Sequence, residues 1–390
     1  MQRQSNRPYC SYPWPRVMAT SIVLVCALVR SCFGLDPAKN LRQYVLRTWT
    51  SEQGLPQNSV RPMLQTRDGF LWIGTRGGLA RFDGASFVLY RANASNSIPN
   101  DSITALAEDR DGNLWISSPG GLTRYRNGVM HTYGVRDGLP ENSIWRLTAD
   151  PSGGIWVVTR HSDLFHFDGT KIQRFPGPFV AGPEEVNSLL EDERGTLWFA
   201  TFHGLFALRP GGGFARYTSK DGLAGDRVFA LALDHHGEVW AAGDGGITRE
   251  SKDRLVATVI PELTTATLLA FDPNAKDDAI WTGSTGQGLF RLTPQGMQRM
   301  RVTQGLTSDE LWLLYFTRDG SLRLGAVNGL NELSDGAVTS YSIGDGIPKS
   351  TLGMQSSQDA NGELWFGHNK FMVHADGGKL FPMSPLAATS

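Results

Sequence analysis

The side chains that could contact a ligand recur once in each copy of a repeated unit. Eleven residues before a marker position, seven copies carry Arg61, Thr104, Trp145, Asn187, Phe229, Trp312 and Met354. Aromatic rings mixed with a few polar groups are typical of a binding surface. We therefore predict that Arg61, Trp145, Asn187, Phe229 and Trp312 bind a ligand. Arg61 would meet an anionic or carbonyl group, and the two tryptophans a flat or sugar-like face; the alternative is that these large side chains fill uneven gaps between units.

A second recurrent set lies fourteen residues before the marker and is polar. Its members are Asn58, Asp101, Asn142, Glu184, Asp226, Asp309 and Thr351. Each starts the first strand of its unit, so we expect the set to ring one mouth of a central channel. Asn and Asp commonly hold tight turns with their own side chains, and we favour that structural role. The alternative is a ring of oxygen ligands for a small molecule or cation.

Residues for catalysis or metal binding do not cluster in the sequence. None of the eight histidines has metal-ligand spacing to a cysteine or to a second histidine one helical turn away. The carboxylates are dispersed and offer no identifiable acid–base pair. The sequence therefore predicts no enzyme, no catalytic residue, no metal site and no cofactor.

The marker that counts the units is a tryptophan spaced by about 42 residues. The marked positions are Trp72, Trp115, Trp156, Trp198, Trp240, Trp281, the substituted Arg323, and Trp365. A fixed period of this length with strand-like content is typical of a β-propeller blade. We expect the tryptophans to fill the gaps between neighbouring blades. Eight copies predict eight blades; the alternative is seven, with the weak copy near Leu322 or the last copy outside the ring.

One unit predicts four short strands, so the fold class is all-β. In the first copy they cover residues 60–66, 70–75, 79–82 and 86–91, and glycine-containing turns separate them. Residues 54–390 are then one propeller of eight repeats, preceded by an N-terminal segment, residues 35–53. Residues 41–50 of that segment resemble a fourth strand without its blade. We expect this strand to complete the last blade and close the ring.

Residues 1–34 have the features of a signal peptide. They contain four arginines and no acidic residue, residues 17–29 are apolar, and Cys32-Phe33-Gly34 places small residues where a signal peptidase reads them. We expect cleavage near Gly34 and a periplasmic or secreted protein; the alternative is an uncleaved membrane anchor. All three cysteines lie in this leader, so the mature chain has no disulfide framework.

The charge of the mature chain excludes some classes of partner. The leader holds four of the 37 basic residues and none of the 38 acidic ones, which leaves 33 basic and 38 acidic residues and a net charge of −5. A chain of this charge is not expected to bind nucleic acid or an anionic membrane surface.

The motifs of the repeat resemble a known family. Gly54-Leu-Pro-Gln-Asn-Ser-Val, Asp68-Gly-Phe-Leu-Trp-Ile-Gly-Thr and Gly78-Leu-Ala-Arg-Phe-Asp-Gly together are similar to the two-component regulator propeller repeat. The resemblance covers residues 49–367. It implies a sensory, ligand-binding input module of a histidine kinase, a hybrid two-component regulator or a diguanylate cyclase, and it supplies no catalytic residue.

This chain departs from the family plan because it stops at Ser390 without a second apolar span or an output motif. We interpret it as a fragment that lacks its output domain, or as a stand-alone propeller. The expected partner is an unknown small molecule or carbohydrate-like ligand, with self-association or a signalling partner as further interactions. Membrane contact would come only through an uncleaved leader or a missing C-terminal span. The alternatives are an exported lyase or glycosidase, and a protein-interaction scaffold.

Overall fold

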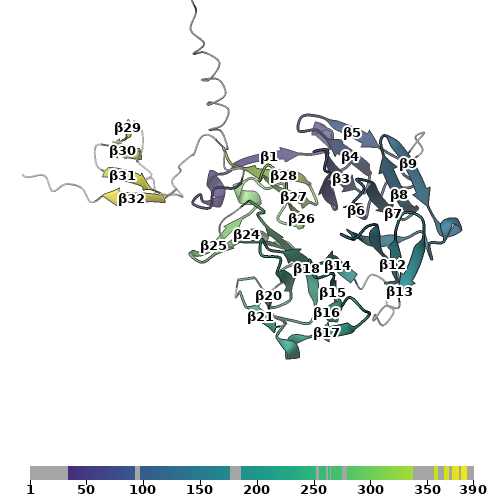
Figure 1. Cartoon of the computed structure of the whole chain (residues 1–390). Helices are drawn as coiled ribbons and strands as arrows, with labels where there is room; N and C mark the ends of the chain where they lie inside the picture. The colour runs from purple at the N-terminus through teal and green to yellow at the C-terminus, as the bar shows by residue number, and fades with distance from the viewer. Residues whose placement is uncertain are drawn as a thin grey trace, which may run out of the picture. The chain divides into compact units, whose positions relative to one another are not determined.

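The computed structural model describes the chain from residue 34 to residue 383, with gaps. The described residues are 34–92, 97–175, 186–251, 254–260, 262–263, 265–274, 279–336, 355–358, 364–368, 371–376 and 379–383. Nearly all regular structure in these ranges is β-strand, arranged as eight four-stranded antiparallel sheets (Figure 1). The predicted all-β class is confirmed.

Six of the sheets are formed by four consecutive strands each. They are β2 (Met63–Gln65), β3 (Leu71–Thr75), β4 (Gly78–Phe82) and β5 (Phe87–Tyr90); β6 (Ala105–Glu108), β7 (Leu114–Ser118), β8 (Gly121–Arg126) and β9 (Val129–Tyr133); β10 (Ile144–Ala149), β11 (Ile155–Thr159), β12 (Leu164–Phe167) and β13 (Ile172–Phe175); β14 (Val186–Glu191), β15 (Leu197–Thr201), β16 (Gly204–Leu208) and β17 (Phe214–Tyr217); β18 (Val228–Leu233), β19 (Val239–Gly243), β20 (Gly246–Ser251) and β21 (Arg254–Thr258); and β22 (Leu268–Phe271), β23 (Ile280–Ser284), β24 (Gly288–Thr293) and β25 (Gly296–Met300). These are blades 1 to 6 of a propeller.

The seventh blade combines the two ends of the ring. Its strands are β26 (Leu311–Phe316), β27 (Leu322–Ala326), β28 (Gly329–Ser334) and, as the fourth strand, β1 (Val45–Trp49). Strand β1 pairs antiparallel with β28 from Val45 opposite Ser334 to Trp49 opposite Leu330, and the two strands lie side by side in Figure 1. An N-terminal closing strand is thus present, but its partner is the copy marked by Arg323. The prediction that it completes the last copy is wrong.

The ring has seven blades. Its innermost strands contact one another in the order β2, β6, β10, β14, β18, β22, β26, and β26 in turn contacts β2. The last repeat copy forms a sheet of its own, β29 (Gln355–Gln358), β30 (Leu364–His368), β31 (Phe371–Asp376) and β32 (Lys379–Met383). The count of eight blades is wrong, and the alternative of seven with the last copy outside the ring is confirmed. The reason is that β1 and β32 each supply a fourth strand, so the last copy needs no strand from the N-terminus.

The marker tryptophans pack between neighbouring blades, as expected. Trp115 in β7 is fully buried, and its ring meets Tyr133 of its own blade at 5.8 Å and Phe167 of blade 3 at 5.1 Å between ring centroids. Trp72 lies in the same way between Tyr90 and Tyr125. Because a lone four-stranded sheet leaves two apolar faces exposed, this packing makes each blade depend on its neighbours.

Arg323 takes the marker position in blade 7 and is buried with Glu332, its ion-pair partner on β28. Its guanidinium lies 5.2 Å from the ring centroid of Trp49 on β1. Trp49 in turn contacts Phe82 of blade 1 at 5.7 Å. The closing strand therefore supplies the aromatic contact between blades 7 and 1 that the substituted marker position lacks.

Short 3-10 helices precede the innermost strands of several blades. They are η2 (Ser51–Gln53), η3 (Val135–Asp137), η4 (Ser219–Asp221) and η5 (Val302–Gln304), with η1 (Leu41–Gln43) in the N-terminal segment. After each of the first four, a glycine in the left-handed region ends the turn, with φ from 100° to 108°, and a buried leucine follows. This geometry explains the Gly-Leu pair of the repeat. No helix within the described ranges is long and apolar enough to cross a membrane.

Candidate functional site

A cavity of about 550 Å³ lies among the innermost strands of the ring, and all five predicted ligand residues line it. Each of the five is half-buried, whereas the residue just before it on the strand is fully buried in every case. The buried neighbours are Val60, Ile144, Val186, Val228 and Leu311. The structure therefore places the predicted residues together on the channel face, with the apolar set on the opposite face. Met354 lies outside the described residues.

A β-bulge aims four of these side chains into the channel. The register between the first two strands of the blade shifts at Trp145, Asn187, Phe229 and Trp312, and each is the extra residue that the neighbouring strand leaves unpaired. A bulge of this kind bends the strand and redirects one side chain, and bulges are frequent next to functional sites. The sequence reasoning missed this feature, because two residues opposite one cannot be read from a single strand.

On one part of the channel wall, three side chains at the channel position form hydrogen bonds with the neighbouring blade. Thr104 Oγ1 donates to the carbonyl oxygen of Ile144 at 2.8 Å, Trp145 Nε1 to that of Val186 at 3.0 Å, and Asn187 Nδ2 to that of Val228 at 2.8 Å. In each bond the acceptor belongs to the next blade along the chain. The three residues therefore have a structural role, while the ring of Trp145 still lines the cavity.

The wall between blades 7 and 1 is built differently. The guanidinium of Arg61 lies 4.5 Å from the ring centroid of Trp312, and that of Arg76 lies 5.8 Å from the same ring. Trp312 Nε1 donates to Glu310 Oε1 at 3.1 Å, within its own strand region. We call Arg61, Arg76 and Trp312 the arginine–tryptophan corner. Here an aromatic face and two cations meet at the channel, a geometry suited to cation–π contact and to anions.

The charge of the cavity wall has one sign. Among the described residues that line it, the charged ones are Arg61, Arg76 and Arg146. Arg146 is partly engaged, because its Nε donates to the carbonyl oxygen of Asn187 at 2.7 Å and its guanidinium stacks on Trp145 at 4.4 Å. Arginine stays protonated throughout the physiological pH range, so the wall attracts anions. Arg76 and Arg146 were not predicted from the sequence, since neither stands at the repeat position that signals the others.

The recurrent polar set has a different place. Asn58, Asn142, Asp226 and Asp309 each accept the backbone N–H of the first residue of the preceding 3-10 helix, at 2.6 to 3.1 Å. Asp101 accepts the N–H of Ala92 at 2.6 Å. These five residues are not among those that line the cavity. Their contacts fix the loop that enters each blade; Glu184 and Thr351 lie outside the described residues.

An ionisable cluster lies between blades 3 and 4, away from the channel. His166 Nε2 is 2.8 Å from Asp150 Oδ2, and Trp156 Nε1 donates to Glu191 Oε2 at 2.8 Å. Burial, with the nearby charge of Asp150, raises the pKa of Glu191 to about 7. These side chains pack at the interface between the two blades and do not line the cavity.

Comparison with known proteins identifies the repeat. Residues 54–77, 97–120, 138–161 and 182–203 match the sequence model described as "Two component regulator propeller". Four copies of the repeat therefore match the two-component regulator propeller repeat. A curated relative, histidine kinase P4 of Formosa agariphila, is 46% identical over 50 residues, which are 13% of this chain and 4% of that protein.

Solved structures with a similar fold include extracellular domains of two-component systems. The extracellular domain of the hybrid two-component system BT3049 from B. thetaiotaomicron has a TM-score of 0.68 and 20% identity, over 89% of this chain and 50% of that one. Virginiamycin B lyase from Staphylococcus aureus has a TM-score of 0.59 and 14% identity, over 75% of this chain and 99% of that one. At these identities the likeness shows the fold alone. The chain spans half the length of the BT3049 domain.

Proposed function

We propose that this chain is an exported, non-enzymatic sensory propeller, the input module of a bacterial two-component or diguanylate cyclase signalling protein. The regulator-propeller repeats and the likeness to extracellular domains of two-component systems support this role. The basic, acid-free leader with its apolar stretch supports export to the periplasm or the medium. In this proposal a histidine kinase or cyclase domain provides the output.

The ligand in this proposal is an anion with a flat or sugar-like face, bound in the channel at the arginine–tryptophan corner. The observation that carries it is the pair of guanidinium groups, Arg61 and Arg76, over the ring of Trp312 in a cavity of about 550 Å³. A carboxylate would accept hydrogen bonds from arginine, and a sugar ring or aromatic plane would stack on the tryptophan. The volume is in the range of small-molecule sites.

A lyase or glycosidase role is less well supported. General acid–base catalysis needs a group whose pKa lies near the working pH. The charged residues that line the described part of the cavity are arginines, which bind anions but do not exchange protons at neutral pH. The corner therefore fits recognition better than turnover.

The experiment is a thermal-shift screen of the mature chain with charged and neutral probes of matched size. The panel pairs oligogalacturonates with neutral galacto-oligosaccharides, and adds aromatic carboxylates. We expect acidic members to raise the melting temperature, and the shift to shrink with added salt because charge attraction is screened. Arg61→Gln should abolish the shift. The matched control is Arg110→Gln, which removes the same charge from an exposed turn and should leave the shift unchanged.

Two results would contradict the proposal. Equal shifts from acidic and neutral members would remove the role of the arginines. An acid-specific shift that survives Arg61→Gln would place the ligand elsewhere on the molecule.

A further inference from the structure

The N-terminal segment is fixed to the ring from its first residues after the leader. The backbone N–H of Leu35 donates to Asp272 Oδ2 at 3.3 Å, and both residues are buried. The Leu35 side chain belongs to the core cluster that contains Leu41 and Tyr44 together with residues of blades 6 and 7, such as Trp281. The attachment therefore begins at Leu35, directly after the Cys32-Phe33-Gly34 signal.

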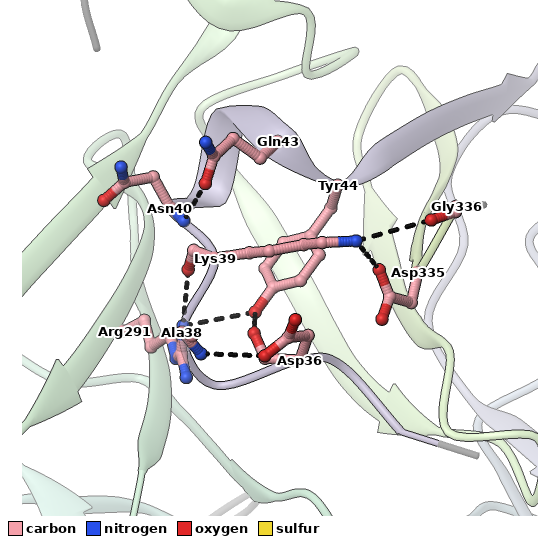
Figure 2. Close-up of polar contacts among 9 residues, drawn as sticks. All are labelled: Asp36, Ala38, Lys39, Asn40, Gln43, Tyr44, Arg291, Asp335 and Gly336. Carbon is pink, nitrogen blue, oxygen red and sulfur yellow. Dashed lines mark hydrogen bonds and ion pairs between the residues drawn. The ribbon is translucent and has the colours of Figure 1, made fainter. Parts of the chain in front are cut away.

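Arg291 of β24 holds the next part of the segment. Its Nη2 donates to the carbonyl oxygen of Pro37 at 3.0 Å, and its Nη1 to that of Lys39 at 3.0 Å and to Tyr44 Oη at 3.2 Å. Tyr44 Oη donates to the carbonyl oxygen of Asp36 at 2.7 Å. Lys39 forms an ion pair with Asp335 beyond the end of β28 (Figure 2). These bonds hold the backbone around Leu35 in one conformation.

Asp272 stands in a position that other blades use differently. Asp109, Asp192 and Asp234 each accept a backbone N–H two residues on with Oδ1, and the indole N–H of the marker tryptophan with Oδ2 at 2.7 to 2.8 Å. Asp272 Oδ1 also accepts the N–H two residues on, from Asn274 at 2.9 Å. In blade 6, however, Oδ2 of Asp272 accepts the backbone N–H of Leu35. In blades 2, 4 and 5, the corresponding Oδ2 accepts the indole N–H of the marker tryptophan.

We propose that signal peptidase cleaves the Gly34–Leu35 bond and that the new α-ammonium group of Leu35 forms a buried ion pair with Asp272. Water adds across the bond: the hydroxyl joins the carbonyl carbon of Gly34, and a proton joins the nitrogen of Leu35. At neutral pH the products are the Gly34 carboxylate, which leaves with the leader, and the Leu35 ammonium, which stays at Asp272. Cleavage acts on the unfolded chain during export, so the bond needs no access in the folded ring. This inference rests on the export proposed above.

The consequence is a ring that is more stable after processing. Before cleavage, Leu35 offers Asp272 one neutral peptide N–H. After cleavage it offers a cation, so the attraction between two opposite charges is added to the hydrogen bond with the Asp272 carboxylate. The attraction offsets the cost of keeping the Asp272 carboxylate buried, and the ordered backbone around Leu35 holds the two groups in contact. Blades 6 and 7, which hold the segment, should benefit most.

The first test is the N-terminus of the exported full chain, read by intact mass and N-terminal sequencing. We expect the protein to begin at Leu35. A chain that begins elsewhere, that keeps its leader, or that carries a lipid on Cys32 would overturn the inference. Export with cleavage at another bond would overturn it without affecting the proposed sensory function.

The second test is a cycle of four proteins. The mature chain is released from a fusion with Leu35 as its first residue, or with three extra residues before Leu35, and each form is made with the wild-type Asp272 and with the Asp272→Asn substitution. The extension should lower the melting temperature by several degrees in the wild-type pair and by much less in the pair that carries Asp272→Asn. Equal losses in both pairs would overturn the ion pair.

A third measurement uses only proteins that keep Asp272, in case Asp272→Asn does not fold. The α-amine of the mature form and that of the extended form are labelled with an acylating reagent at pH 7. An ion-paired, buried ammonium should react at least about tenfold more slowly, which corresponds to 1.4 kcal/mol. Equal labelling rates would contradict the proposal.

Discussion

Two positions of the same repeat, eleven residues apart, are used in opposite ways. The marker position is Trp in six of the seven ring blades, and its side chain is packed between blades. The channel position lies at a bulge in four of the blades, and its residue differs from blade to blade. A position that fills the same gap in each copy favours one residue type, whereas a position that is not paired with the neighbouring strand can differ between copies.

The channel position itself divides into two parts. Thr104, Trp145 and Asn187 donate to backbone carbonyls of the next blade, so their polar atoms help to close the ring. Trp312 donates to Glu310 within its own strand region and lies beside two arginines. If the ligand binds at the arginine–tryptophan corner, as proposed, residues for stability and residues for recognition lie on different parts of the channel wall. The following substitutions test this difference, from the largest expected effect to the smallest.

Trp115→Ala should have the largest effect on stability. Removal of a fully buried Trp between blades 2 and 3 leaves a cavity and deprives Asp109 of its indole partner, at a cost of about 3–5 kcal/mol in the free energy of unfolding. Urea unfolding measures it. The control is Val129→Ala on the exposed face of β9, expected within about 0.5 kcal/mol. A loss below about 1 kcal/mol for Trp115→Ala would show that the marker position does not hold the ring.

Glu191→Gln should stabilise the protein at high pH. The pKa of Glu191 is raised in the folded state from 4.5 to about 7, so the protonated form favours folding at low pH, and this contribution is lost as pH rises through about 7. Glutamine mimics the protonated acid and can still accept the Trp156 N–H. After allowance for solvent screening, we expect a gain of about 1–2 kcal/mol at pH 8 and no gain at pH 4.5. If the free energies of unfolding of the variant and the wild type differ equally at both pH values, Glu191 does not titrate in this way.

Trp145→Phe should cost about 1 kcal/mol in the free energy of unfolding. Phenylalanine keeps a ring on the channel wall but removes the N–H that reaches the Val186 carbonyl of blade 4. The Val186 carbonyl oxygen therefore loses its hydrogen-bond donor from blade 3. Guanidinium chloride unfolding at neutral pH checks the value; an unchanged midpoint would mean that the bond between blades is not stabilising.

Trp312→Phe is the matched substitution on the other part of the wall and should have the smallest effect. The substitution removes the indole N–H that donates to the half-buried Glu310 side chain. The Glu310 carboxylate can then form a hydrogen bond with water instead. We expect a change within about 0.5 kcal/mol under the same unfolding conditions. If Trp312→Phe costs as much as Trp145→Phe, the two parts of the wall are not different.

The fold could be predicted from the sequence where one side chain repeats with one role. The marker tryptophans gave the period, the blade and the packing between blades, because filling the same gap requires the same large ring. The blade count could not be settled in this way. Both β1 and β32 have a sequence compatible with a fourth strand, and only the pairing of Val45–Trp49 with β28 shows which blade closes the ring.

The candidate site could be predicted in part. The varied residues from Arg61 to Trp312 stood out because a packing position would be uniformly apolar, and they line one cavity. The bulges and the added arginines could not be anticipated. A bulge depends on the register between two strands, and Arg76 reaches the channel from the turn between β3 and β4.

The most direct test of the ligand site is calorimetric titration of the mature propeller with an oligogalacturonate and with a neutral galacto-oligosaccharide of the same length. We expect that only the acidic sugar binds, that Arg61→Gln weakens its binding at least about tenfold, and that Trp145→Phe and Arg110→Gln leave the affinity unchanged. Binding of the neutral sugar with equal affinity, or acidic binding that is unaffected by Arg61→Gln, would contradict the assignment of the arginine–tryptophan corner as the ligand site.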